Sequence, residues 1–160
     1  MASLFVAKSR RFLVISMFLT MGLNLVACQR SNDATTPSVN TNPANQVASL
    51  QSTDLMIGNG AVAEAGKQVT VHYTGWLYEA SAADKHGQQF DSSVSRGTPF
   101  SFQLGGGQVI KGWDQGVVGM KIGGHRNLII PSDLAYGRSG RGPIPPAATL
   151  VFDIQLIAVN

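Results

Sequence analysis

From residue 54 onward, short runs of alternating apolar and polar residues are separated by glycine, and this pattern restricts the fold strongly. Val69, Val71 and Tyr73 alternate with polar residues, and a period of two indicates a strand with one buried face. The last segment, residues 150–158, alternates in the same way. Glycine occupies 18 of the 160 positions and discourages long helices, so we expect a β-rich domain.

Two more strands and a single helix are predicted from the same region. Residues 100–104 alternate apolar and polar side chains, and the apolar run 128–130 is closed by Pro131. Residues 109–117 carry a helical spacing of apolar residues but are flanked by glycine on both sides. The pattern therefore predicts an α+β domain, an antiparallel sheet of about five strands against one short helix, with long loops at 78–89 and 131–148.

The first 27 residues have the order of an export signal. Basic residues at Lys8, Arg10 and Arg11 precede an apolar run, residues 12–23, as in a secretory signal peptide. The alternative is a membrane anchor, but the run is shorter than the about 20 residues that a span requires. We therefore assign residues 1–27 to a signal peptide.

Cys28 follows this segment and is the single cysteine of the chain. The tetrad Leu25-Val26-Ala27-Cys28 resembles the bacterial lipobox, in which the cysteine is lipidated and becomes the first residue after cleavage. A lone thiol has no internal disulfide partner, and several acyl chains on one site give stable anchoring. Gln29 follows in place of the aspartate that signals inner-membrane retention, so we expect a lipid anchor in the bacterial cell envelope, at the outer membrane.

Residues 28–53 are expected to form the lipidated cysteine and a disordered polar tether. The segment is rich in Ser, Thr, Asn, Gln, Ala and Pro and has no aromatic residue, so it cannot bury enough apolar area to offset its ordering entropy. The folded domain is expected at residues 54–160.

The charge distribution argues against a nucleic-acid partner. Three of the 12 Lys and Arg residues lie before residue 12, which leaves nine against nine Asp and Glu in the rest of the chain. These nine form no basic cluster of the kind that tracks phosphates. His72, His86 and His125 are far apart and do not have metal-ligand spacing, so we expect neither a metal nor another cofactor.

The domain contains seven short sequence blocks in a characteristic order. The blocks are Val71-His72-Tyr73-Thr74-Gly75, Phe90-Asp91-Ser92-Ser93, Arg96, Pro99-Phe100, Val109-Ile110-Lys111-Gly112-Trp113, Ala135-Tyr136-Gly137, and Ile144-Pro145-Pro146 with Ala148-Thr149-Leu150-Val151-Phe152-Asp153. In these blocks and their order the chain resembles the FKBP family over about two thirds of its length. The resemblance implies a strongly curved antiparallel sheet wrapped around the short helix, and peptidyl-prolyl cis-trans isomerase activity on proline-containing client proteins.

The resemblance also implies the site. Trp113 would form the floor of a proline pocket, Phe90, Asp91 and Tyr136 would act on the twisting bond, and the Ile110 N–H and Tyr136 hydroxyl would donate to substrate carbonyls. The remaining substrate-binding residues would be Tyr73, Arg96, Phe100, Val109, Ile110, Ile144 and Phe152. Tacrolimus and rapamycin would occupy the same cavity.

Alternatives remain at three points. Without the resemblance, Asp91 would more simply start an Asx turn and the aromatic residues would belong to an ordinary core. The chain could also be a lipid-anchored chaperone or interaction module that keeps this fold without turnover.

Residues 79–89 form an insertion relative to compact family members, and Gly140–Pro143 differs from the usual sequence there. No dimerisation helix precedes the domain, so we expect a monomer.

Overall fold

The computed structural model describes residues 43–160. The expected signal peptide, the lipidation site Cys28 and most of the expected tether lie outside the described residues. Within the part of the chain that the structure describes, no helix has the length and apolar character needed to cross a membrane.

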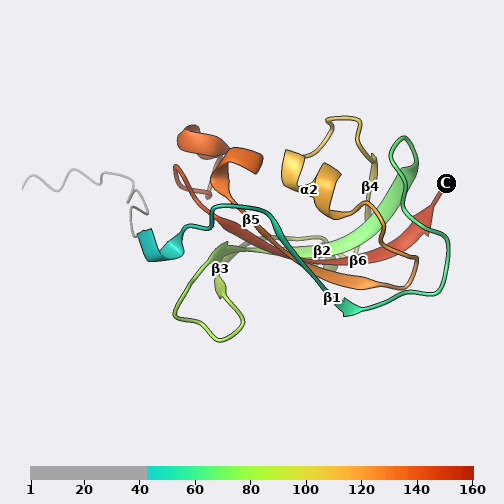
Figure 1. Cartoon of the computed structure of the whole chain (residues 1–160), viewed down its shortest axis with the longest axis horizontal. Helices are drawn as coiled ribbons and strands as arrows, with labels where there is room; N and C mark the ends of the chain where they lie inside the picture. Colours follow the sequence, from blue (N-terminus) through green and yellow to red (C-terminus); the bar gives the residue numbers. More distant parts are fainter. Residues whose placement is uncertain (1–42) are drawn as a thin grey trace, which may run out of the picture. The chain divides into compact units, whose positions relative to one another are not determined.

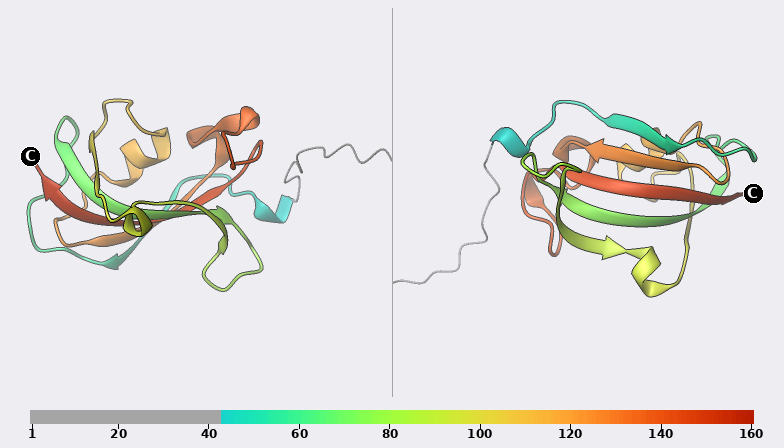
Figure 2. Two further views of the ribbon diagram at one scale, coloured as in Figure 1. Left: turned by 180° about the vertical axis from the view of Figure 1, so that it is seen from behind. Right: turned by 90° about the horizontal axis from the view of Figure 1, so that it is seen from below.

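The core of the domain is one six-stranded sheet in which every strand pair is antiparallel. Its strand order is β1-β5-β6-β2-β3, and β4 also pairs with β2 (Figure 2). The strands are β1 (Gln51–Met56), β2 (Gln68–Tyr78), β3 (His86–Ser92), β4 (Phe100–Gln103), β5 (His125–Ile130) and β6 (Leu150–Val159). The sheet has one strand more than the approximate number expected from the sequence.

The two long central strands carry the alternation that predicted them. In β2, Val69 and Val71 are fully buried and Tyr73 nearly so, while the residues between them are half-buried. β6 pairs with β2 along most of its length and points Ile154 and Leu156 into the same core. Val151 is the exception, because it lies on the opposite face and is also fully buried.

The helices are short and lie close to the ends of strands. α2 (Lys111–Gly116) covers the core face of the sheet (Figure 1), and α1 (Ser93–Arg96) follows β3 directly. Three single 3-10 turns complete the described chain: η1 (Pro43–Asn45), η2 (Ser132–Leu134) and η3 (Gly137–Ser139). The helix expected at 109–117 is confirmed, but it is shorter at both ends.

The domain boundary expected at residue 54 falls inside β1, so the folded region begins earlier than the composition suggested. Asn45 of η1 is buried, and its side-chain oxygen accepts a hydrogen bond from the Ala80 N–H at 3.0 Å. β1 escaped detection because all six of its residues are exposed, so no face alternates. Alternation of apolar and polar residues arises where one face of a strand is buried, so an exposed edge strand does not show it.

Candidate active site

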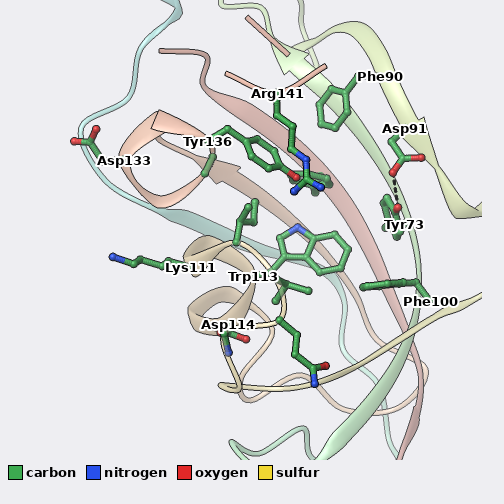
Figure 3. A pocket seen from close by; sticks show the side chains of 16 residues that line it. Tyr73, Phe90, Asp91, Phe100, Lys111, Trp113, Asp114, Asp133, Tyr136 and Arg141 are labelled. Carbon is green, nitrogen blue, oxygen red and sulfur yellow. Dashed lines mark hydrogen bonds between the residues drawn. The ribbon is translucent and has the colours of Figure 1, made fainter. Parts of the chain in front are cut away.

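A cavity of about 760 Å³ opens between the sheet, α2 and the loop that contains η2 and η3. Nine of the eleven site residues predicted from the sequence line it (Figure 3). They come from six different segments of the chain and are Tyr73, Phe90, Asp91, Phe100, Val109, Ile110, Trp113, Tyr136 and Phe152. The convergence of residues so distant in sequence is the main structural feature of the site.

Trp113 lies at the centre of the aromatic side chains and is only 4% exposed. Its ring meets Tyr73 edge to face at 5.0 Å between centroids and Phe152 at 5.2 Å. Phe102, which lies deeper in the core, contacts it at 5.6 Å. Edge-to-face aromatic pairs at these separations are favourable and rigid, so Trp113 forms a fixed apolar floor.

Gly75 of β2 makes room for two of the walls. A Cβ atom at this position would lie 2.6 Å from the ring of Phe152 and 2.8 Å from the ring of Phe90. Because the glycine has no side chain, those two rings can meet edge to face above it, 5.6 Å apart. The aromatic wall therefore depends on a missing side chain as well as on the aromatic residues.

The carboxylate of Asp91 is held by two donors. The Tyr73 hydroxyl donates to its Oδ2 at 2.5 Å, and the Arg96 guanidinium donates to its Oδ1 and forms an ion pair with it. Arg96 also donates to the Tyr73 hydroxyl at 3.1 Å. The three side chains form a closed network at the rim of the cavity, which is more than the Asx turn considered from the sequence.

The helix α1 brings Arg96 back toward Asp91. Ser92 caps this helix by accepting from the Ser95 N–H at 3.2 Å. The next residue, Ser93, is fully buried and its hydroxyl accepts from the Tyr73 N–H at 2.8 Å. These two serines fix the turn that follows β3, and the turn places the guanidinium over the carboxylate.

The network sets the protonation states of its members. Burial alone would raise the pKa of Asp91, but the hydrogen bonds from Tyr73 and Arg96 outweigh burial and hold this pKa below its ordinary value of 3.8. Burial and the neighbouring carboxylate raise the pKa of the Tyr73 hydroxyl above 10.0. At neutral pH the site therefore holds an ionised Asp91 and a neutral, donating Tyr73.

Two of the hydrogen-bond donors at the cavity that have no partner within the described residues are the Ile110 N–H and the Tyr136 hydroxyl. The Ile110 N–H precedes the first turn of α2, where backbone donors are not used by the helix. The Tyr136 hydroxyl is the second free donor, and its ring lines the cavity. Both donors are thus available to a bound molecule.

Two predicted residues do not line the cavity. Ile144 is only 7% exposed and packs in the hydrophobic core, so the structure gives it a packing role. Arg96 acts through Asp91 and Tyr73 instead of contacting the cavity itself.

The sequence analysis missed a set of polar lining residues. These are Gln108, Lys111, Asp114, Asp133 and Arg141. Arg141 lies in the stretch where the family blocks do not align, so the resemblance carried no signal for it. Helical spacing gave no signal for Lys111 and Asp114 either, because residues two before and one after Trp113 do not share its face of the helix.

The fold and the cavity together define a class of protein: a small antiparallel-sheet domain with an open cavity lined by six aromatic side chains. None of the residues that line the cavity is Ser, Thr, Cys or His, the side chains most often used as nucleophile or base. The comparisons with known proteins agree with this class. A model of the family described as FKBP-type peptidyl-prolyl cis-trans isomerase matches residues 60–157, which is more than half of the chain.

Individual relatives show the same family. An FK506-binding protein of Streptomyces anulatus is 53% identical over 114 residues, which cover 70% of this chain and 87% of the relative. The peptidyl-prolyl cis-trans isomerase FPR2 of Saccharomyces cerevisiae is 57% identical over 96 residues, covering 59% of this chain and 67% of that protein. The chain belongs to the FKBP-type peptidyl-prolyl cis-trans isomerase family and catalyses the isomerisation of X-Pro peptide bonds.

The fold is also found in solved structures. FkpA from Escherichia coli matches with a TM-score of 0.60 and 41% sequence identity, covering 69% of this chain and 48% of that chain. The chain thus spans about half the length of FkpA and is similar to that part of it.

Proposed function

We propose that the aromatic cavity binds the proline ring of a client protein and stabilises the twisted X-Pro amide without any covalent step. Rotation about the amide is slow because resonance gives a barrier of about 20 kcal/mol. A twisted amide has lost resonance and charge separation, so an apolar site favours it over the planar form. Each 1.36 kcal/mol of such preference gives a factor of ten in rate.

The free donors support a binding mode for the peptide. The Ile110 N–H and the Tyr136 hydroxyl are unpaired within the described residues and lie at the cavity. We assign them to two carbonyl groups of the client, which would hold the peptide in a turn with its proline over Trp113. Fixing the peptide in this way removes orientational freedom before the bond rotates.

Asp91 is proposed to act on the rotating bond from the rim of the cavity, beside Phe90. Its charge is held by Tyr73 and Arg96, so it presents a fixed negative field and does not transfer a proton. A fixed charge costs no reorganisation when the amide twists.

The observation that carries this function is the convergence of five aromatic rings around Trp113 at an open cavity. The direct test is a proline-limited peptide isomerisation assay with the fragment 43–160, with and without rapamycin. We expect acceleration at micromolar protein or below, abolished by the macrolide. No acceleration at micromolar protein would contradict the proposed function.

We also propose that tacrolimus and rapamycin bind in this cavity. The relative from Streptomyces anulatus is named an FK506-binding protein, and FK506 is tacrolimus. A ligand at 100 times its dissociation constant stabilises the folded state by about 2.7 kcal/mol. Thermal unfolding of the fragment should therefore shift upward with macrolide concentration, and a Trp113→Ala variant should lose that shift.

The site of action is proposed from the sequence of the N-terminal region. We infer that residues 1–27 are removed, that Cys28 is lipidated, and that the protein acts as a monomer on clients at the bacterial cell envelope, anchored in the outer membrane. Mass spectrometry of membrane-extracted protein should find the acyl mass on Cys28. A Cys28→Ser chain should instead leave the membrane fraction, and an unmodified Cys28 would contradict the anchor.

A further inference from the structure

The backbone of Arg141, in the loop that borders the cavity, is held in place by hydrogen bonds. Its N–H donates to the Ile144 carbonyl at 2.9 Å, and the Ile144 N–H donates back to the Arg141 carbonyl at 2.9 Å. Ile144 is buried in the core, and Gly142 makes the tight turn between the two with a φ of 54°. The backbone that carries Arg141 is thus tied to the core, although its side chain is exposed.

The side chain of Arg141 lies over the mouth of the cavity. Its guanidinium carbon is 5.7 Å from the centre of the Tyr136 ring, a cation-π distance. Figure 3 shows the guanidinium reaching over the cavity toward Trp113, whereas Lys111 and Asp133 point away from it. Of the cationic side chains that line the cavity, Arg141 is therefore the one aimed at a bound peptide.

The guanidinium of Arg141 has no carboxylate partner among the described residues. The other arginines near the sheet do have one, because Arg96 pairs with Asp91 and Arg126 with Asp54. A guanidinium has five N–H donors in a fixed planar array. The donors of Arg141 therefore face the open mouth of the cavity unused.

None of the three carboxylates that line the cavity, those of Asp91, Asp114 and Asp133, pairs with Arg141. Asp91 forms its ion pair with Arg96. Asp114 accepts from the N–H groups of Gly105 at 2.9 Å and Gly107 at 3.0 Å, which turns it toward its own loop. Among the residues that the structure describes, the Arg141 guanidinium therefore stays without a carboxylate partner next to the free donors of Tyr136 and Ile110.

We propose that Arg141 is a specificity-determining residue that selects client segments with an Asp or Glu directly beside the X-Pro bond. A carboxylate one residue from a proline held over Trp113 lies at the rim where the guanidinium reaches. Arginine binds carboxylates through two parallel, charge-assisted hydrogen bonds. This inference rests on the proposed use of the cavity for the proline ring.

The test uses the full chain as the enzyme and matched tetrapeptides as substrates. Two pairs are needed, one with Glu or Gln before the proline and one with Glu or Gln after it. We expect kcat/KM of the unmodified chain to be about 3- to 10-fold higher for Glu in at least one pair at low salt, mostly through a lower KM. The preference should shrink as added salt screens the exposed charge.

Two variants separate this role from a general effect on the loop. Arg141→Gln should bring the Glu-to-Gln ratio to about one, and Arg141→Glu should reverse the preference. Arg138→Gln is the matched control, because Arg138 is exposed on the same loop and does not line the cavity. It should leave the ratio unchanged.

The possible failures are distinguishable. A preference for Glu that survives Arg141→Gln, or no preference in the unmodified chain although the Gln peptides are isomerised, overturns the inference and leaves the proposed function intact. No acceleration of any peptide by the unmodified chain overturns both.

Discussion

At the level of single residues, the network of Tyr73, Asp91 and Arg96 explains how a charge can be kept beside an apolar pocket. A carboxylate in such a place is costly unless its oxygens are hydrogen-bonded, and here both are. Because the partners come from β2 and from α1, the network also ties two elements together at the rim of the site.

Replacing Asp91 by Asn should slow catalysis without unfolding the protein. The variant keeps the shape of the side chain and loses the charge, so we expect kcat/KM to fall on the order of tenfold, which corresponds to about 1.4 kcal/mol. The isomerisation assay measures this, with circular dichroism as the check on folding. Asp84→Asn, an exposed aspartate in the loop after β2, is the control. Full activity in Asp91→Asn would show that the charge is dispensable.

The same carboxylate predicts a pH dependence of stability. Its pKa is lowered in the folded state, so between that pKa and 3.8 the unfolded chain binds more protons. The contribution of Asp91 is then fully present above about pH 4 and is lost as the pH falls below that value. Thermal unfolding at pH 6 and pH 3 should show the difference in Tm between the unmodified chain and Asp91→Asn narrowing at pH 3. A constant difference would mean that Asp91 titrates normally.

Most of the cavity could be predicted from the sequence because family blocks carry residue identities together with their order. Tyr73, Asp91 and Trp113 were found in this way. Ile144 packs in the core and does not line the cavity, and a buried apolar residue next to a site has the same sequence signature as one inside it. Arg141 was missed because it lies in a loop that departs from the family's usual sequence, and a single charged residue there belongs to no periodic pattern.

At the level of elements, α2 determines where the floor of the cavity lies. A Cβ atom on Gly112 would lie 2.9 Å from Cδ1 of the buried Ile130 in β5 and closer still to its Cγ2. The glycine lets the helix approach the sheet, and the next residue, Trp113, is thereby held down against Tyr73 and Phe152.

Gly112→Ala should therefore destabilise the domain. We expect a loss of about 1–3 kcal/mol, as for other overpacked cores, measured by urea unfolding. Gln115→Ala is the matched control, because Gln115 is exposed on the same helix and surface substitutions usually change stability by less than about 0.5 kcal/mol. Equal unfolding midpoints for the two variants would show that the helix has room to move.

Some elements were predictable and others were not, for reasons of burial. β2 buries one face and alternates accordingly, and β6 does the same except at Val151, which is buried on the opposite face. β1 is exposed throughout and β3 is largely polar, so these two strands owe their structure to pairing with β5 and β2. Pairing with a distant strand leaves little trace in a local sequence pattern.

At the level of the whole molecule, β1 closes the edge of the sheet over β5. Asp54 of β1 accepts from the Arg126 side chain at 2.6 Å and 3.0 Å. Arg126 is only 13% exposed and also donates to the carbonyl of Gly116. The edge strand β1 thus supplies the carboxylate that pairs with the nearly buried guanidinium of Arg126.

A fragment that begins at residue 57 should be less stable than one that begins at residue 43. It lacks β1 and leaves Arg126 without its carboxylate, and a hydrogen bond to a charged group contributes about 1.5–3 kcal/mol. We expect a drop in Tm of several degrees by calorimetry. A fragment beginning at residue 51 keeps β1 without η1 and should lose less. Equal Tm values for the fragments from 43 and 57 would show that β1 contributes nothing to the fold.

The two tryptophans of this chain lie on opposite faces of the sheet. Trp113 forms the floor of the cavity, and its Nε1 has no hydrogen-bond partner within the described residues. Trp76 lies three residues after Tyr73 in β2, so its side chain is on the opposite face of the strand, away from the cavity. There it stacks on His86 with 3.9 Å between the ring centroids. Ligand binding in the cavity should therefore change the intrinsic fluorescence of Trp113. The emission of Trp76, which does not line the cavity, should stay constant and serve as an internal reference.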